Sequence, residues 1–403
     1  MSAALSNSDS ANSRFRRRFS SSSPFSRRAS ETSSPPYFDF HLMGWTASSQ
    51  RSQNCRLTRL RGEVSNESSH SRYRLAKNVF QLHGVDRKGR PVLVRRVRRE
   101  LLLKVLGELE PCLIGIEAST GAFYWQRQFE KLGHVVKIMA PQYVKPFVRR
   151  QKNDSNDAEA ICTAVQQRNM RFVPKKTLEQ QDIQALHRAR QRLVNHRTAL
   201  TSQMRGLLLD RGIAIAVSAT QARRLIPKIL SAANDELTEM MREIVSSLYA
   251  FMLQIDERIK AFDRKVTAVF KASAVCQRIA MIRGIGPKTA TAMIAAIGDR
   301  SDFKNGRHLA AWLGLVPRQH SSGDRKVMMG ITKRGSQHLR TLLVHGARAV
   351  VRTAVRKTDS RSMWVNELRQ RRGYNRATVA VANKNARVIW AVLTSGEPYR
   401  AAA

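Results

Sequence analysis

Acidic residues are scarce in this chain. Its 403 residues contain 30 Asp and Glu against 71 Lys and Arg, which gives a formal net charge of +41 at pH 7. The excess is too large and too widely spread to form a single patch, so a solvated basic surface without a partner is a poor explanation. A nucleic-acid partner is the first expectation.

Cysteines and long apolar runs are also few. The four cysteines lie far apart, at Cys55, Cys112, Cys162 and Cys276, with no paired spacing of the kind that binds zinc. We therefore expect a reducing compartment, with neither disulfides nor structural zinc. No apolar run approaches the roughly 20 residues that span a bilayer, so we expect a soluble protein without membrane contact.

Lysine is absent from the first seventy residues, which contain 19 serines and ten arginines. Nothing in this segment repeats with a helix or strand period. We predict that residues 1–73 form a disordered Ser/Arg-rich leader. Because the segment is also poor in acids, an organelle transit peptide is the alternative.

Residues 74–175 have the mixed order of an α/β domain. Two strand-like runs, 79–85 and 91–94, flank a turn at 86–90, and a helix is expected over 100–109. A strand ending at Glu117, a helix through 125–132, a strand over 134–139 and a helix opening near Asp154 follow. This order predicts a ribonuclease-H-like (RuvC-like) sheet.

Residues 176–272 form a helical connector. Leucines recur every seven residues in its first half, and apolar residues step by three and four in its second half, which predicts a coiled coil. The first set is Leu186, Leu193, Leu200 and Leu207; the second is Leu237, Met241, Ile244, Leu248, Phe251, Ile255, Ile259, Phe262, Val266 and Val269. An antiparallel hairpin and a dimerising coil are both open.

Residues 273–394 form a mainly helical C-terminal domain, followed by a tail, 395–403. Arg283-Gly284-Ile285-Gly286-Pro287-Lys288 precedes a small-residue helix and has the pattern of a helix-hairpin-helix motif. Backbone amides beside Gly284 and Gly286 could hold a phosphate at the helix start, with Arg283 and Lys288 adding charge. A tight turn between core helices gives the same letters and is the alternative.

Three carboxylates are candidates for chemistry. Glu117 ends a buried strand, while Asp154 and Asp157 share one face of a helix start. Together they could bind two Mg²⁺ or Mn²⁺ ions and support cutting or rejoining of a phosphodiester. Asp154 could instead act as a helix cap, and both acids could simply favour the helix dipole.

Five motifs, in this order and spacing, resemble the DEDD-type insertion-sequence transposases of the IS-one-ten family, eleven-eleven subgroup. They are Ile114-Gly-Ile-Glu-Ala-Ser119, Lys152-Asn-Asp-Ser-Asn-Asp-Ala-Glu159, Gly284-Ile-Gly-Pro-Lys-Thr-Ala290, Trp312-Leu-Gly-Leu-Val-Pro-Arg318 and Gly330-Ile-Thr-Lys-Arg-Gly335. The resemblance implies a RuvC-like catalytic domain and a C-terminal domain with a nucleophilic serine. It also implies a bacterial cytoplasmic, nucleoid-associated oligomer that acts on DNA and is guided by a structured noncoding RNA.

By this resemblance, Glu117, Asp154 and Asp157 are the second, third and fourth acids of the catalytic tetrad, and the serine is Ser322, with Ser321 as second choice. Arg318, His320, Arg325 and Lys326 lie near it in the sequence. Nucleic-acid binding is assigned to Arg283, Gly284, Gly286, Lys288, Arg318, Arg325, Lys326, Lys333 and Arg334.

The first acid of the tetrad is missing. Arg74 stands where the family has aspartate, and a cation there would repel metal ions. This protein is therefore expected to bind the metal ions weakly and to have impaired catalytic activity. Some choices of codons for Arg72-Tyr73-Arg74-Leu75 encode Ala-Ile-Asp when the reading frame is shifted by one base. We therefore hypothesise that the leader is an out-of-frame product.

Two other functions compete with a transposase that has lost some activity. The first is a catalytically dead DNA- or RNA-binding remnant of such an enzyme. The second is a junction-resolving nuclease with a RuvC-like core, which fits the acids but gives no reason for a serine-bearing C-terminal domain.

Overall fold

The computed structural model describes residues 70–75, 78–86, 88–148, 153–233, 235–298, 300–323 and 325–400. Residues 1–69 of the predicted disordered leader lie outside these ranges. Residues 70–73, which were also predicted to be disordered, instead belong to the first strand, β1 (His70–Leu75). None of the helices in the described ranges is both long and apolar enough to cross a membrane.

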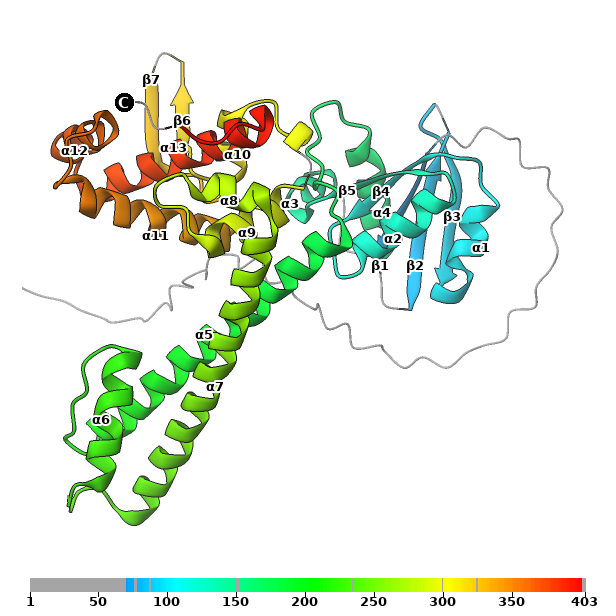
Figure 1. The fold of residues 1–403 in the computed structure, drawn as a ribbon. Helices are drawn as coiled ribbons and strands as arrows, with labels where there is room; N and C mark the ends of the chain where they lie inside the picture. The colour runs from blue at the N-terminus through cyan, green and yellow to red at the C-terminus, as the bar shows by residue number, and fades with distance from the viewer. Residues whose placement is uncertain are drawn as a thin grey trace, which may run out of the picture. The chain divides into compact units, whose positions relative to one another are not determined.

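A five-stranded mixed sheet forms the N-terminal α/β part (Figure 1), with the strand order β3-β2-β1-β4-β5. β2 (Val79–Val85) pairs antiparallel with both β1 and β3 (Pro91–Arg98). β4 (Leu113–Glu117) runs parallel to β1 and to β5 (Val135–Met139). The predicted hairpin is confirmed, and Asp86 fixes its turn by accepting from the backbone N–H groups of Lys88 and Arg90.

Helices cover both faces of this sheet. α1 (Leu102–Gly107), which follows the 3₁₀ turn η1 (Arg99–Leu101), and α2 (Ala122–Lys131) share one apolar core with the sheet. α3 (Pro141–Val144), the 3₁₀ turn η2 (Lys145–Phe147) and α4 (Asp154–Val165) bury a second, smaller core on the other face. The predicted mixed α/β order is therefore confirmed.

The connector consists of two long helices, α5 (Leu178–Leu209) and α7 (Glu239–Ala272), with a shorter helix, α6 (Ala219–Ser231), between them. α5 and α7 run antiparallel, because Arg190 bonds to Asp263 while Arg197, further along α5, bonds to Asp256, earlier on α7. The two helices thus pair within the chain (Figure 1). α6 was not predicted; the sequence indicated only a reversal of direction.

The buried seam of α7 agrees with the predicted one only in part. Of the predicted residues, Ile255, Ile259 and Val266 are buried. Ile244 and Phe251 are instead 41% and 50% exposed, and Val245 and Met252, which were not predicted, are buried in that half of the helix. The three- and four-residue steps fit two neighbouring faces of one helix, so spacing alone did not identify the face that packs on α5.

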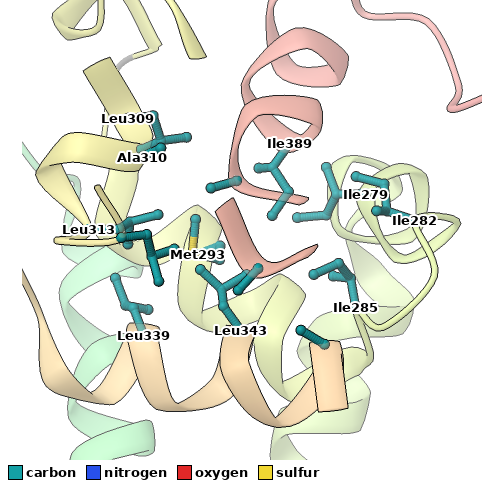
Figure 2. Close-up of a cluster of buried hydrophobic side chains, with 14 of the residues drawn as sticks. Ile279, Ile282, Ile285, Met293, Leu309, Ala310, Leu313, Leu339, Leu343 and Ile389 are labelled. Carbon is teal, nitrogen blue, oxygen red and sulfur yellow. The ribbon is translucent and has the colours of Figure 1, made fainter. Parts of the chain in front are cut away.

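The C-terminal part is mainly helical, as predicted. Its elements are α8 (Ala274–Ala280), α9 (Pro287–Ile297), η3 (Arg300–Asp302), α10 (Gly306–Trp312), the strands β6 (Pro317–Ser322) and β7 (Arg325–Ile331), α11 (Gln337–Ala354), α12 (Ser360–Arg372) and α13 (Tyr374–Ser395). Figure 2 shows its core, in which Met293 of α9, Leu343 of α11 and Ile389 of α13 meet.

Two backbones touch where the loop before α9 meets α11. A Cβ atom built on Gly346 would lie 1.8 Å from the carbonyl oxygen of Gly284, and one built on Gly284 would lie 2.8 Å from that of Gly346. Gly284 also has a φ of +87°, which side chains disfavour. Neither position can accept a side chain without moving the loop or the helix.

We expect Gly346→Ala to lower the free energy of unfolding by about 1–3 kcal/mol, because the new methyl group would collide with the Gly284 carbonyl. Gly206→Ala is the matched control: it is also a helical glycine, but nothing lies within 4 Å of its Cβ position. The control should leave stability unchanged or raise it by up to about 1 kcal/mol. Urea unfolding of both variants measures the difference, and equal stabilities would contradict the backbone contact.

Candidate functional site

Position 74 and Glu117 occupy equivalent places on neighbouring parallel strands. The register pairs Tyr73 of β1 with Ile116 of β4, and Arg74 and Glu117 each come one residue later. Arg74 also pairs with Gln81 of β2, which places it at the centre of the sheet. The register therefore puts an arginine beside Glu117, at the position where the resemblance expects the first acid.

Glu117 lies on the face of β4 that α4 covers. Ile114 and Ile116 belong to the core under α1 and α2, so the alternating Gly115 and Glu117 face the other way. A Cβ on Gly115 would lie 3.1–3.3 Å from the side chains of Val165 and Ile161 on α4. Gly115 thus lets α4 lie close to the strand that carries Glu117.

Asp154 and Asp157 lie in the first turn of α4, as predicted, but Asp154 is not the helix cap. Asn153 is the cap, and its side-chain oxygen accepts from the Asn156 backbone N–H at 2.7 Å. Asp154 is exposed and Asp157 is half-buried. The capping explanation of Asp154 is therefore wrong, while a favourable interaction with the helix dipole remains.

In the part of the chain that the structure describes, no group of three or more His, Cys, Asp and Glu side chains is arranged to hold a metal ion. Arginine at position 74 leaves three of the four acids that the resemblance expects, whereas a two-metal site uses acids alone.

The predicted phosphate-binding loop connects α8 and α9, which pack together. Gly286 is the residue before α9, and a Cβ there would meet nothing within 4 Å. The two predicted cations both pair inside the chain: Arg283 bonds to Asp359 at 2.8 Å, and Lys288 bonds to Asp263 at 2.9 Å. A phosphate at this loop would compete with those carboxylates.

Ser322 ends β6 at the tip of a two-stranded hairpin with β7, and every residue of β6 is exposed. Gly323, in the turn, has a φ of +53°. Ser321 is engaged locally: its hydroxyl oxygen accepts from the Gln319 side chain at 3.0 Å and from the Val327 backbone N–H at 3.3 Å. Ser322 makes no side-chain hydrogen bond to any residue in the described ranges.

The base of the hairpin is held by backbone contacts between two of the sequence motifs. Thr332 donates its N–H to the Val316 carbonyl at 2.8 Å, and Lys333 donates to Gly314 at 3.1 Å. A Cβ on Gly335 would lie 2.1 Å from the Trp312 carbonyl oxygen. An isolated hairpin is marginally stable, so this anchoring fixes where Ser322 stands.

The basic residues near the serine are exposed. Arg318, Arg325, Lys333 and Arg334 all lie on the hairpin or at its base with their side chains in solvent, and Lys326 pairs with Ser321 in the register. Sequence reasoning missed the hairpin itself. The signal was Gly323-Asp324 between two short runs, a two-residue pattern typical of hairpin turns.

Comparison with known proteins identifies the family. A family model described as Transposase IS116/IS110/IS902 family matches residues 276–362, and a second transposase model, of the DEDD type, matches residues 75–211. The chain is 46% identical over 329 residues to the transposase for insertion sequence element IS1111A of Coxiella burnetii, covering 82% of this chain and 90% of that protein.

A probable family 20 transposase of Pseudomonas aeruginosa is 45% identical over 327 residues, which cover 81% of this chain and 97% of that protein. The transposase for insertion sequence element IS1328 of Yersinia enterocolitica is 36% identical over 324 residues. Both family models fall on the parts that carry the carboxylates and the serine hairpin. This chain belongs to the IS116/IS110/IS902 family of transposases.

Proposed function

We propose that this transposase cuts and rejoins DNA through a covalent bond between Ser322 and a DNA phosphate. The observation that carries the proposal is the place of Ser322, at the exposed tip of an anchored hairpin. Exposed arginines on the hairpin and at its base supply positive charge for the DNA backbone. A serine on a protruding element suits a polymeric substrate, which cannot enter a pocket.

We further propose that Glu117, Asp154 and Asp157 are the remaining acids of a tetrad. The DEDD transposases generally use a divalent metal, which stabilises charge on phosphate oxygens when bound. The support is the β1–β4 register and the packing of α4 on the face that carries Glu117. Mg²⁺ or Mn²⁺ would bind weakly here, because an arginine, Arg74, stands at the position of the first acid.

The partners are DNA and, by the family resemblance, a structured noncoding guide RNA and further copies of this chain. We assign DNA or RNA phosphates to Arg318, Arg325, Lys326, Lys333 and Arg334, and to the loop with Arg283, Gly284, Gly286 and Lys288. The excess of 71 basic over 30 acidic residues supports an extended contact. We place the protein in the bacterial cytoplasm, associated with the nucleoid.

Replacing Arg74 with Asp should strengthen binding of Mg²⁺ or Mn²⁺ and raise cleavage of DNA carrying the element's ends, because a carboxylate would replace a cation beside Glu117. Arg96→Asp is the control, since it makes the same charge change on β3, at the sheet edge. Calorimetric titration with each metal and a DNA cleavage assay measure both effects. Equal behaviour of the two variants would mean that position 74 does not belong to the site.

Ser322→Ala, made in the Arg74→Asp protein, should abolish strand exchange and the covalent protein–DNA species. Stability should change by under about 1 kcal/mol, because the hydroxyl is exposed and makes no hydrogen bond to described residues. Ser321→Ala is the matched control and should keep the covalent species. Gel electrophoresis under denaturing conditions detects that species. If Ser321→Ala abolishes the covalent species and Ser322→Ala does not, Ser321 is the nucleophile. If both variants still form the covalent species, the serine mechanism is excluded.

A further inference from the structure

The hairpin register groups three side chains of complementary chemistry on one face. Ser322 pairs directly with Arg325 across the turn, and His320 pairs with Val327. Side chains on a strand alternate between its faces, and directly paired residues share a face. Ser322, His320 and Arg325 therefore share one face of the hairpin, while Ser321 and Gln319 occupy the other.

Nothing else in the described ranges engages these three side chains. His320, Ser322 and Arg325 are all exposed, and the side chain of none of them has a hydrogen bond or ion pair with another described residue. Ser321, on the opposite face, already accepts two hydrogen bonds. Arg325 thus differs from Arg283 and Lys288, whose charges are paired with carboxylates inside the chain.

The spacing fits a single phosphodiester group. Directly paired residues of antiparallel strands have Cβ atoms about 4.5–5.5 Å apart, so a guanidinium at position 325 can reach a phosphate that touches the Ser322 hydroxyl. His320 lies two residues away along β6, about 6.6 Å at the usual strand rise, a distance that an imidazole can span toward the hydroxyl directly or through one water.

We propose that Ser322, His320 and Arg325 act as one catalytic unit, in which Arg325 binds the phosphate under attack and His320 accepts the serine proton. The inference rests on the proposed role of Ser322 as nucleophile and adds the groups that activate it. Arginine suits this role because its planar fork can hold two phosphate oxygens at once.

The step balances with water as the only other reactant. The Ser322 oxygen forms a bond to phosphorus as the bond from phosphorus to the leaving deoxyribose oxygen breaks. The proton of the serine hydroxyl passes to His320, and the leaving oxygen, which departs on the opposite side of phosphorus, takes a proton from water. Rejoining is the reverse: a deoxyribose hydroxyl loses its proton to water as it attacks the phosphoserine, and His320 returns a proton to the Ser322 oxygen. Arg325 stays charged and stabilises the negative charge that develops on the phosphate.

Labelling of the full-length chain with a phosphonofluoridate tests the unit without DNA or metal. In this reaction the serine oxygen bonds to phosphorus, fluoride leaves, and His320 takes the proton. Peptide mass spectrometry should find the label on Ser322 well ahead of Ser321. His320→Gln should slow labelling on the order of 10²-fold. Arg325→Gln should slow it at least about tenfold, with Arg325→Lys in between.

Two controls separate this effect from general perturbation. Arg352→Gln removes one positive charge from an exposed position on α11, and Gln319→Ala removes a side chain from the other face of β6. Both should label at the rate of the parent. The proposed catalytic unit is wrong if Ser322 is labelled no faster than Ser321. It is also wrong if His320→Gln and Arg325→Gln are both labelled at the rate of the parent.

The result is separable from the proposed function. If Ser322 is labelled through His320 and Arg325, and yet Ser322→Ala still forms the covalent DNA species in the Arg74→Asp protein, the unit stands and the proposed route through Ser322 fails. If Ser322→Ala abolishes that species while His320→Gln and Arg325→Gln form it at the parental rate, the serine route stands and the unit is wrong.

Discussion

Close packing against glycines is the constraint on which both candidate sites depend. Gly115 lets α4 lie against β4, next to the strand end that carries Glu117. Gly335 lies with no room for a side chain against the Trp312 carbonyl and closes the base of the hairpin that carries Ser322. A methyl group at Gly115 would press on the Val165 and Ile161 side chains of α4, and one at Gly335 would collide with the Trp312 backbone. The motifs that identify the family therefore include residues that position chemistry without taking part in it.

The α/β part could be predicted well because its signals are local. Asp86 and Gly89 mark the turn of a hairpin, the apolar run from Cys112 to Ile116 predicts a buried strand, and Glu117 follows at its end. The register of β1 against β4 could not be predicted from the sequence, because Ser71-Arg72-Tyr73-Arg74 lacks the apolar pattern of a central strand. Pairing with two neighbours determines it instead, a long-range effect that no local pattern encodes.

The connector and the hairpin show two other limits. On α7, apolar residues fit two adjacent faces, and packing against α5 decides that Val245 and Met252 are buried while Ile244 and Phe251 are exposed. The serine hairpin has no buried residue on β6, so it lacks the hydrophobic alternation by which strands are recognised. Anchoring at Gly314 and Lys333, outside the hairpin, replaces the core that a strand normally needs.

Net charge alone does not say which cations can meet a phosphate. Hydrogen bonds from Arg283 and Ser362 hold the pKa of Asp359 well below its usual range, so that carboxylate stays charged and holds Arg283. Burial by itself would raise the pKa of Asp263, but hydrogen bonds from Arg190 and Lys288 lower it. Asp263 therefore also stays charged and holds Lys288 in an ion pair. Cations beside such acids are partly neutralised before any nucleic acid arrives. Among the described residues no carboxylate pairs with Arg325, which lies on the face of the hairpin that carries Ser322.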